Sequence, residues 1–160
     1  MRIGITGHQN LGSEVRVGWV CRELSYAVKK YNVTKGITCL AAGADQIYAE
    51  ILKGENIPYI VVVPSDSYEK TFGDISSLEK YQILLKKANR IIKLKFNEPN
   101  EIAFFEAGKK VVNLSRVIFA IWNGKKAKGL GGTADVVKYA LEKNKKVVHF
   151  NPISKKVTEI

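Results

Sequence analysis

Several features that define common protein classes are scarce or missing in this sequence. The 160 residues include only two cysteines and two histidines, with no metal-ligand spacing among them, so the sequence predicts no metal site. Cys21 and Cys39 have no CxxC partner, which indicates reduced, buried thiols rather than a disulfide. No apolar run is long enough to cross a bilayer, and the chain opens directly on a strand-like segment without a signal peptide. We therefore expect a cytoplasmic protein with no membrane segment.

Two familiar nucleotide-binding patterns are also missing. The chain has neither a GxxxxGK[ST] loop nor a GxGxxG pattern after its first predicted strand, which disfavours the two nucleotide folds that carry them. The net charge is +11, from 26 basic and 15 acidic residues. The lysines occur as scattered pairs near predicted helix ends, where the helix dipole favours cations, and no aromatic residues interleave with them. We interpret this charge as a solvated basic surface, and we do not expect a nucleic-acid partner.

The apolar pattern alternates between strands and helices. Strict alternation predicts an α/β fold with a Rossmann-like, doubly wound parallel sheet of about six strands and helices on both faces. With 46% hydrophobic residues the chain can bury one core. We expect a single domain over residues 1–152 and a C-terminal tail over 153–160 that frays. The predicted strands are 2–6, 36–41, 59–63, 90–95, 117–122 and 146–150, and the predicted helices are 13–31, 44–53, 76–88, 101–112 and 131–143.

Ligands of such sheets bind beyond the carboxyl ends of the strands, where the strand order reverses. The loops after strands one, two, four and five are therefore the candidate site. After strand one, Gly7 allows a sharp turn and a close approach, and His8 could contact a phosphate or a base. After strand two, the small residues Gly43 and Ala44 clear space. Asp45 follows them as either a helix N-cap or a contact to a ribose hydroxyl.

The remaining two loops carry the carboxylates and most of the glycines. Glu101 opens the fourth helix, where the dipole favours a carboxylate, and Glu106 lies one turn further on. Four glycines occur between residues 124 and 132, more than a plain turn needs. A strand, a glycine-rich loop and a helix follow one another here, which presents free N–H groups to an anion. The sequence thus predicts a phosphate anchor that ends in Gly131, Gly132, Thr133 and Asp135.

Together these motifs resemble the SLOG superfamily, the Rossmann-like grouping that includes the DNA-processing protein DprA/Smf and the LOG phosphoribohydrolases. The resemblance is to single-domain members, and four stretches carry it: GITGH over 4–8, LAAGADQ over 40–46, EIAFFEAGKKVV over 101–112, and FAIWNGKKAKGLGGTADVVKYA over 119–140. A fifth stretch, Pro64–Tyr68, adds weaker support.

The resemblance implies a nucleotide or nucleotide-derived ligand whose phosphate is held by Gly131, Gly132 and Thr133. It implies no bound cofactor, and because many relatives form dimers through helices that border the cleft, a homodimer is one expectation. The sequence also departs from the LOG enzymes. Their PGGxGTxxE loop has a glutamate three positions after the threonine, whereas here Asp135 follows two positions after Thr133. The preceding helix has Lys109 and Lys110 where the LOG enzymes carry an arginine–lysine motif.

Three functions follow as alternatives. The first is a sensor or carrier that binds a nucleotide-like ligand, which fits the glycine loops and the basic balance. The second is a LOG-like N-glycosidase acting on nucleoside 5′-monophosphates, in which Glu101, Glu106 or Asp135 would orient ribose hydroxyls or activate water. The third, supported only by superfamily resemblance and net charge, is DprA-like binding of single-stranded DNA. The first is preferred.

Overall fold

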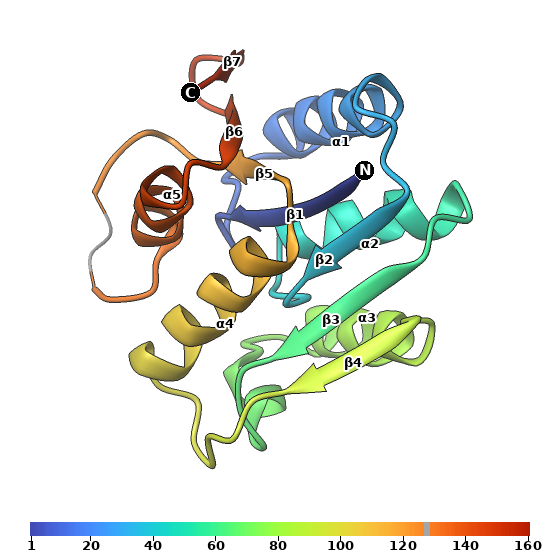
Figure 1. Cartoon of the computed structure of the whole chain (residues 1–160). Coiled ribbons are helices and arrows are strands. Elements are labelled where there is room, and N and C mark those ends of the chain that lie inside the picture. The colour runs from blue at the N-terminus through green and yellow to red at the C-terminus, as the bar shows by residue number, and fades with distance from the viewer. Residues whose placement is uncertain (127–128) are drawn as a thin grey trace.

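A computed structural model describes residues 1–126 and 129–160; Ala127 and Lys128, which fall within the last of the four stretches, lie outside the described residues. Strands and helices alternate along the chain as the hydrophobic pattern predicts (Figure 1). A short 3₁₀ helix, η1 (Tyr68–Thr71), follows the third strand. The strands are β1 (Arg2–Gly7), β2 (Lys35–Thr38), β3 (Tyr59–Val63), β4 (Arg90–Lys93), β5 (Val117–Ile121), β6 (Lys146–Asn151) and β7 (Lys156–Glu159). The α-helices are α1 (Glu14–Lys30), α2 (Ala44–Gly54), α3 (Ile75–Lys86), α4 (Glu101–Leu114) and α5 (Thr133–Glu142).

The strands form one seven-stranded sheet in the order β4-β3-β2-β1-β5-β6-β7. The first six in this order pair in parallel, and β7 pairs antiparallel to β6. The chain winds outward from β1 to β4, returns through α4, and resumes at β5 on the other side of β1. The strand order therefore reverses between β1 and β5. This arrangement confirms the Rossmann-like α/β fold with a mostly parallel sheet.

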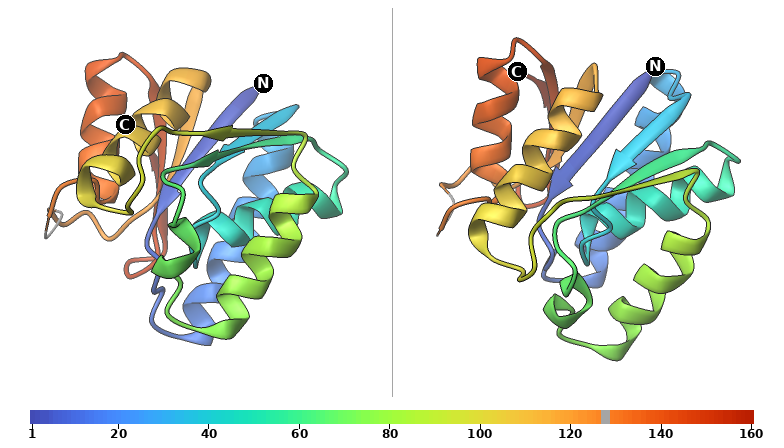
Figure 2. Two further views of the ribbon diagram at one scale, coloured as in Figure 1. Left: turned by 90° about the horizontal axis from the view of Figure 1, so that it is seen from below. Right: turned by 60° about the horizontal axis from the view of Figure 1, so that its bottom comes forward.

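Each face of the sheet is covered by its own helices. Helices α1, α2 and α3 cover one face, and α4 and α5 cover the other, as the two views of Figure 2 show. Successive side chains of a strand point to opposite faces. On β5, Phe119 joins the core beneath α1 and α2, whereas Ile118 and Ala120 join the core beneath α4 and α5. All five β5 residues are buried, as expected for a central strand covered on both sides.

Helix starts follow the capping signals in the sequence. The side chains of Ser13, Asp74 and Asn100 accept hydrogen bonds from the backbone N–H three residues later, at 3.3, 3.1 and 2.8 Å. Helices α2 and α5 instead start at Gly43 and Gly132, and within the described residues neither has a side-chain cap. Their first N–H groups are therefore left for other partners.

The expectation that the C-terminal tail frays is wrong. Residues 156–159 form β7, and the Ile160 N–H and C=O both bond to Val147, at 2.9 and 3.0 Å. Glu159 adds side-chain contacts to Tyr31 and, at 3.0 Å, to Lys146. The tail is polar because β7 is an exposed edge strand of the sheet, and not because it is disordered.

The face of α4 that packs on the sheet does not include its first large apolar residue, because Ile102 is 57% exposed. The residues that contact the sheet are smaller on average, because α4 crosses close to it: they are Ala103, Ala107, Val111 and Val112.

Phe119 is the centre of an aromatic cluster in the larger core. Its ring centroid lies 5.6 Å from that of Tyr31, 5.9 Å from that of Tyr48 and 5.4 Å from that of Phe150. We expect Phe119→Ala to lower the free energy of unfolding by about 3–5 kcal/mol, because the cavity it leaves is enclosed. The exposed Tyr26→Ala change should cost no more than about 0.5 kcal/mol. Urea denaturation of both variants checks this, and equal losses would contradict it.

Candidate functional site

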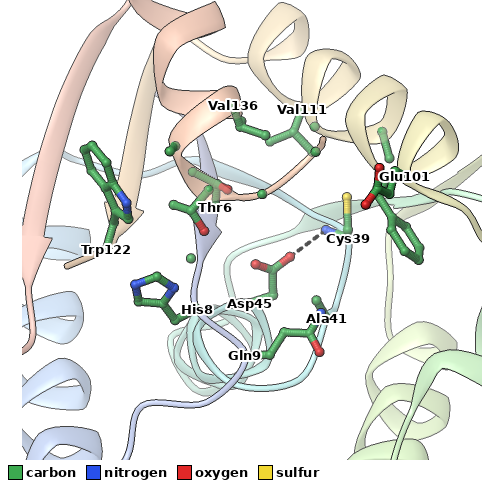
Figure 3. Close-up of a pocket in the computed structure, with 18 of the residues that line it drawn as sticks. Thr6, His8, Gln9, Cys39, Ala41, Asp45, Glu101, Val111, Trp122 and Val136 are labelled. Atoms are coloured by element: carbon green, nitrogen blue, oxygen red, sulfur yellow. Dashed lines mark hydrogen bonds between the residues drawn. The ribbon is translucent and has the colours of Figure 1, made fainter. Parts of the chain in front are cut away.

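A cavity of about 660 Å³ opens at the carboxyl edge of the sheet, over the β1–β5 reversal. The loops after β1 and β5 and the first turn of α5 line one part of it, and the loops after β2 and β3 and the start of α4 line the other. In Figure 3, Trp122 and Glu101 lie on opposite sides of the view, with Thr6, His8 and Asp45 between them. The cavity therefore lies where the topology predicts a ligand.

His8 joins the two central loops. The ring Nε2 of His8 accepts the backbone N–H of Asn123 at 3.1 Å, and the backbone N–H of His8 donates to the Ile121 carbonyl at 3.0 Å. Burial lowers the pKa of His8, and the Asn123 side chain opposes this with a smaller effect. An Nε2 that accepts a hydrogen bond must be unprotonated. The imidazole is therefore neutral at pH 7, and Nδ1 is the nitrogen that can donate.

The N-terminus of α5 contributes backbone donors. The helical hydrogen bonds begin with Asp135 and Val136, whose N–H groups donate to the Gly132 carbonyl at 3.1 and 3.2 Å. The N–H groups of Gly132, Thr133 and Ala134 come before these first helical donors, and all three residues line the cavity. The structure thus brings together Gly7, His8 and the predicted Gly131–Thr133 loop.

Two glycines of this loop have a packing role as well. A Cβ at Gly129 would lie against the Glu101 carboxylate, and a Cβ at Gly131 would lie 2.9 Å from both the Glu101 carbonyl and the Phe105 nitrogen. Gly131 also has φ +86°, which side chains rarely adopt. The glycine-rich loop therefore lies directly on the first turn of α4, which partly explains its composition.

The three predicted catalytic carboxylates are in different environments. Glu101 lines the cavity. Asp135 is not among the lining residues; its Oδ2 accepts the Gly131 N–H at 3.0 Å and holds the loop closed. Glu106 is outside the cavity, forms an ion pair with Lys109 and borders a smaller pocket beside α5. Of the three alternatives the cavity lining therefore includes only Glu101, and a catalytic role for any of them stays a prediction.

Asp45 is a buried carboxylate in the floor of the cavity. Its Oδ2 accepts hydrogen bonds from Thr38 Oγ1 and from the Cys39 N–H, both at 2.9 Å, and Figure 3 shows the bond to Cys39. Burial raises the pKa of Asp45 to about 6, although these hydrogen bonds oppose the shift. It does not cap α2, whose N-cap is Gly43. Its first role is to hold the β2–α2 turn.

The two small residues beside Asp45 lie behind the cavity wall. Gly43 has φ +81°, and a Cβ there would lie 2.3 Å from the Gln9 carbonyl oxygen. The Ala44 N–H donates to the His8 carbonyl at 3.2 Å. Neither residue is among those that line the cavity. They position the His8 loop, and their predicted contact to a ligand stays a prediction.

Sequence reasoning missed the loop after β3, which supplies Pro64, Tyr68 and Thr71 to the wall. The Tyr68 ring packs edge-on against Phe104 of α4, with centroids 6.3 Å apart, and closes the β3 side of the cavity. The weak resemblance over Pro64–Tyr68 was the available signal. Trp122 and Asn123 line the β5 side, and the basic residues Lys125 and Lys126 border it.

Within the described residues, no three His, Cys, Asp or Glu side chains are grouped so that they could hold a metal ion. In the same part of the chain, none of the helices is both long and apolar enough to span a bilayer.

The fold is similar to that of several solved proteins. DprA from Helicobacter pylori superposes with a TM-score of 0.67 at 16% identity, and DprA from Streptococcus pneumoniae with 0.66 at 12%. The present chain is covered to 93% and 92% in these matches but spans only 64% and 49% of the two DprA chains. A molybdenum-cofactor-binding protein from Rippkaea orientalis matches with a TM-score of 0.57 at 17% identity, over 92% of this chain and 74% of that one.

No protein-family model matches the sequence, and no curated protein matches it significantly. At these identities the structural matches establish the Rossmann-like fold alone, and the resemblance of the motifs to the SLOG superfamily stays a prediction.

The raised pKa of Asp45 predicts a pH-dependent stability. The carboxyl loses its proton near pH 3.8 in the unfolded chain but near pH 6 in the folded one, so ionisation favours unfolding. Stability should fall as pH rises from about 4 to 6, by roughly 3 kcal/mol, and level off above. Relative to wild type, Asp45→Asn should therefore gain stability as pH rises. Urea titrations at several pH values measure this difference.

The matched control is Asp66→Asn, which removes an exposed carboxylate paired with Lys93. The free energy of unfolding of Asp66→Asn relative to wild type should not rise between pH 4 and 6. A difference between Asp45→Asn and wild type that is constant with pH would contradict the assignment.

The loop geometry predicts that two glycines respond differently to alanine. Gly131→Ala combines a positive φ with a clash against the α4 backbone, so we expect a loss of about 2–3 kcal/mol. Gly124 has a similar φ of +83° but open space around its Cβ position, so Gly124→Ala should lose only about 1 kcal/mol. Chemical denaturation distinguishes them, and equal losses would show that the α4 contact does not constrain the loop.

Proposed function

We propose that this protein binds a nucleotide or nucleotide-derived small molecule in the cavity over the β1–β5 reversal, as a sensor or carrier. The single observation that carries this proposal is that the N-terminus of α5, which has no side-chain cap among the residues that the structure describes, and the His8 loop converge on one cavity. The ligand phosphate would accept hydrogen bonds from the N–H groups of Gly132 and Thr133.

The electrostatics of the β5 side support an anion. The α5 dipole places partial positive charge at Gly132–Thr133, and Lys125 and Lys126 border the same side. The Asp135 carboxylate is bonded to the Gly131 N–H and is not among the residues that line the cavity. A ligand phosphate on this side of the cavity would therefore contact backbone N–H donors and lysine side chains.

The opposite side of the cavity suits an apolar ring. Tyr68, Phe104 and Pro64 contribute apolar surface there, and the Cys39 thiol lies beside them. Burial and the nearby Asp45 charge raise the pKa of Cys39, so its thiol stays protonated and unreactive. A ligand with a phosphate at one end and a base at the other would fit this polarity.

The carboxylates favour binding over hydrolysis. A glycosidase needs carboxylates placed about the scissile bond. Of the three candidates only Glu101 lines the cavity, and the deeper Asp45 is engaged by Thr38 and Cys39. The fold neighbours also include a protein named for binding the molybdenum cofactor, which is consistent with a carrier on this fold.

The proposal predicts a specific effect of Thr133→Pro. Proline is well tolerated at the first helical position and removes the Thr133 N–H without breaking α5. Gly132 has φ −71° and ψ 172°, which a following proline accepts. Losing a charge-assisted hydrogen bond should weaken binding of a nucleoside monophosphate about 10- to 100-fold and leave binding of the nucleoside nearly unchanged. Isothermal titration with AMP and adenosine measures both, and screening CMP, GMP, UMP and ADP-ribose covers other bases.

Glu14→Pro is the matched control, because it makes the same change at the first position of α1, outside the cavity. It should leave affinity unchanged. A Thr133→Pro protein that is folded and binds AMP as wild type does would refute the phosphate site. Release of free base from any monophosphate would show the glycosidase alternative instead.

A further inference from the structure

Many of the basic residues lie at the end of the sheet opposite the cavity, where the parallel strands begin; we call this end the basic edge. This edge consists of the helix ends and strand starts, residues 1–2, 29–35, 53–59, 85–90, 113–117, 141–146 and 159–160. It contains twelve basic and three acidic side chains, which is +9 of the net +11. At the opposite edge, among the described residues of 7–14, 38–45, 63–75, 93–101, 121–133 and 151–156, seven basic and seven acidic side chains cancel.

The strand starts form a row of cations. Five of the six parallel strands begin at or directly after a basic residue. Arg2 is in register with Lys35 on one side, and its carbonyl accepts the Arg116 N–H at 3.0 Å on the other. Arg90 is in register with Ile60 and Lys146 with Val117, so the row is staggered along the strands, and with strands about 4.8 Å apart it extends about 24 Å across the sheet from β4 to β6. Its members, in sheet order, are Arg90, Lys35, Arg2, Arg116 and Lys146; Figure 1 shows β1 to β4 starting on the right of the view, with their arrowheads toward the left.

Helix dipoles do not account for this row. They favour the lysines at helix ends, such as Lys29, Lys30 and Lys86, but strands have only small net dipoles. Like charges on neighbouring strands destabilise a sheet. Within the described part of the chain, ion pairs involve only two of the twelve basic residues, in Lys29–Glu55 and Lys146–Glu159. The remaining charge is available to a polyanion.

We propose that this basic edge, defined by the ranges above, binds the phosphodiester backbone of a nucleic acid without sequence preference, separately from the cavity. A 24 Å row matches about seven phosphates of one strand of a duplex. Exposed amide and hydroxyl side chains, Asn32, Thr34, Asn89 and Asn144, lie between the cations and suit phosphate and sugar contacts. The proposal does not depend on the cavity ligand.

The test is fluorescence anisotropy of the whole protein with labelled single-stranded and duplex oligonucleotides of mixed sequence. For about five phosphates neutralised, affinity for duplex should fall several hundred-fold between 50 and 200 mM salt. Arg2→Gln, Lys35→Gln and Arg116→Gln together should weaken binding at least 30-fold at 100 mM salt and reduce the salt slope by nearly three. Circular dichroism and thermal melting verify that the variant is folded.

A second triple variant removes the same charge from exposed lysines at the opposite edge: Lys70→Gln, Lys155→Gln and Lys156→Gln. It should lose less than about threefold, and saturating AMP should not displace the oligonucleotide. Equal losses of oligonucleotide affinity in both triple variants would overturn the proposal. So would a loss of affinity in the double variant Lys125→Gln, Lys126→Gln without a loss in the triple variant of the row. So would binding to vesicles of acidic phospholipid with no binding to nucleic acid.

Discussion

The reversal of strand order between β1 and β5 is the constraint on which the site depends. The chain leaves β1 toward α1 on one face of the sheet and leaves β5 toward α5 on the other. Adjacent strands therefore send their following loops in opposite directions, and side chains cannot fill the space between them. The hydrogen bond from the Asn123 N–H to His8 bridges the base of this gap, so the cavity keeps a defined floor.

Glycines set how closely the elements around this gap approach one another. Gly7 lies against Ala44 and Ile121, Gly43 lies against the His8 and Gln9 carbonyls, and Gly131 lies against α4. These contacts bring three loops and a helix N-terminus to one place. The glycines of a loop at such a junction are therefore required, in the first place, by close packing. Its use in binding a phosphate follows from the N–H groups that the packing exposes.

Much of the fold and part of the site could be predicted from the sequence. The fully apolar runs over β3 and β5 and the caps Ser13 and Asn100 are local signals, and they place the strands and helices well. Alternation predicted a parallel sheet, and with it the Gly7–His8 and Gly131–Thr133 loops as candidates, but the strand order and its reversal between β1 and β5 come from the structure. The burial of small residues such as Ala103 and Ala107 was not visible, because it depends on how closely α4 crosses the sheet.

The environment of single carboxylates was equally hidden. The sequence alone does not distinguish the candidate carboxylates Asp45, Glu101, Glu106 and Asp135. In the structure each has different neighbours, which give it a different role. The charge distribution is a similar case. The lysine pairs 29–30, 86–87 and 145–146 are far apart along the chain but meet at one edge, because every helix in a parallel sheet returns the chain to the same side.

The central claim is that a ligand phosphate binds at the N-terminus of α5. Its most direct test is the amide spectrum of ¹⁵N-labelled protein during titration with AMP and, separately, with inorganic phosphate. The account predicts that the amide signals of Gly132 and Thr133 shift with both, while those at the start of α1 do not move. Unchanged Gly132 and Thr133 signals at saturating AMP would contradict it.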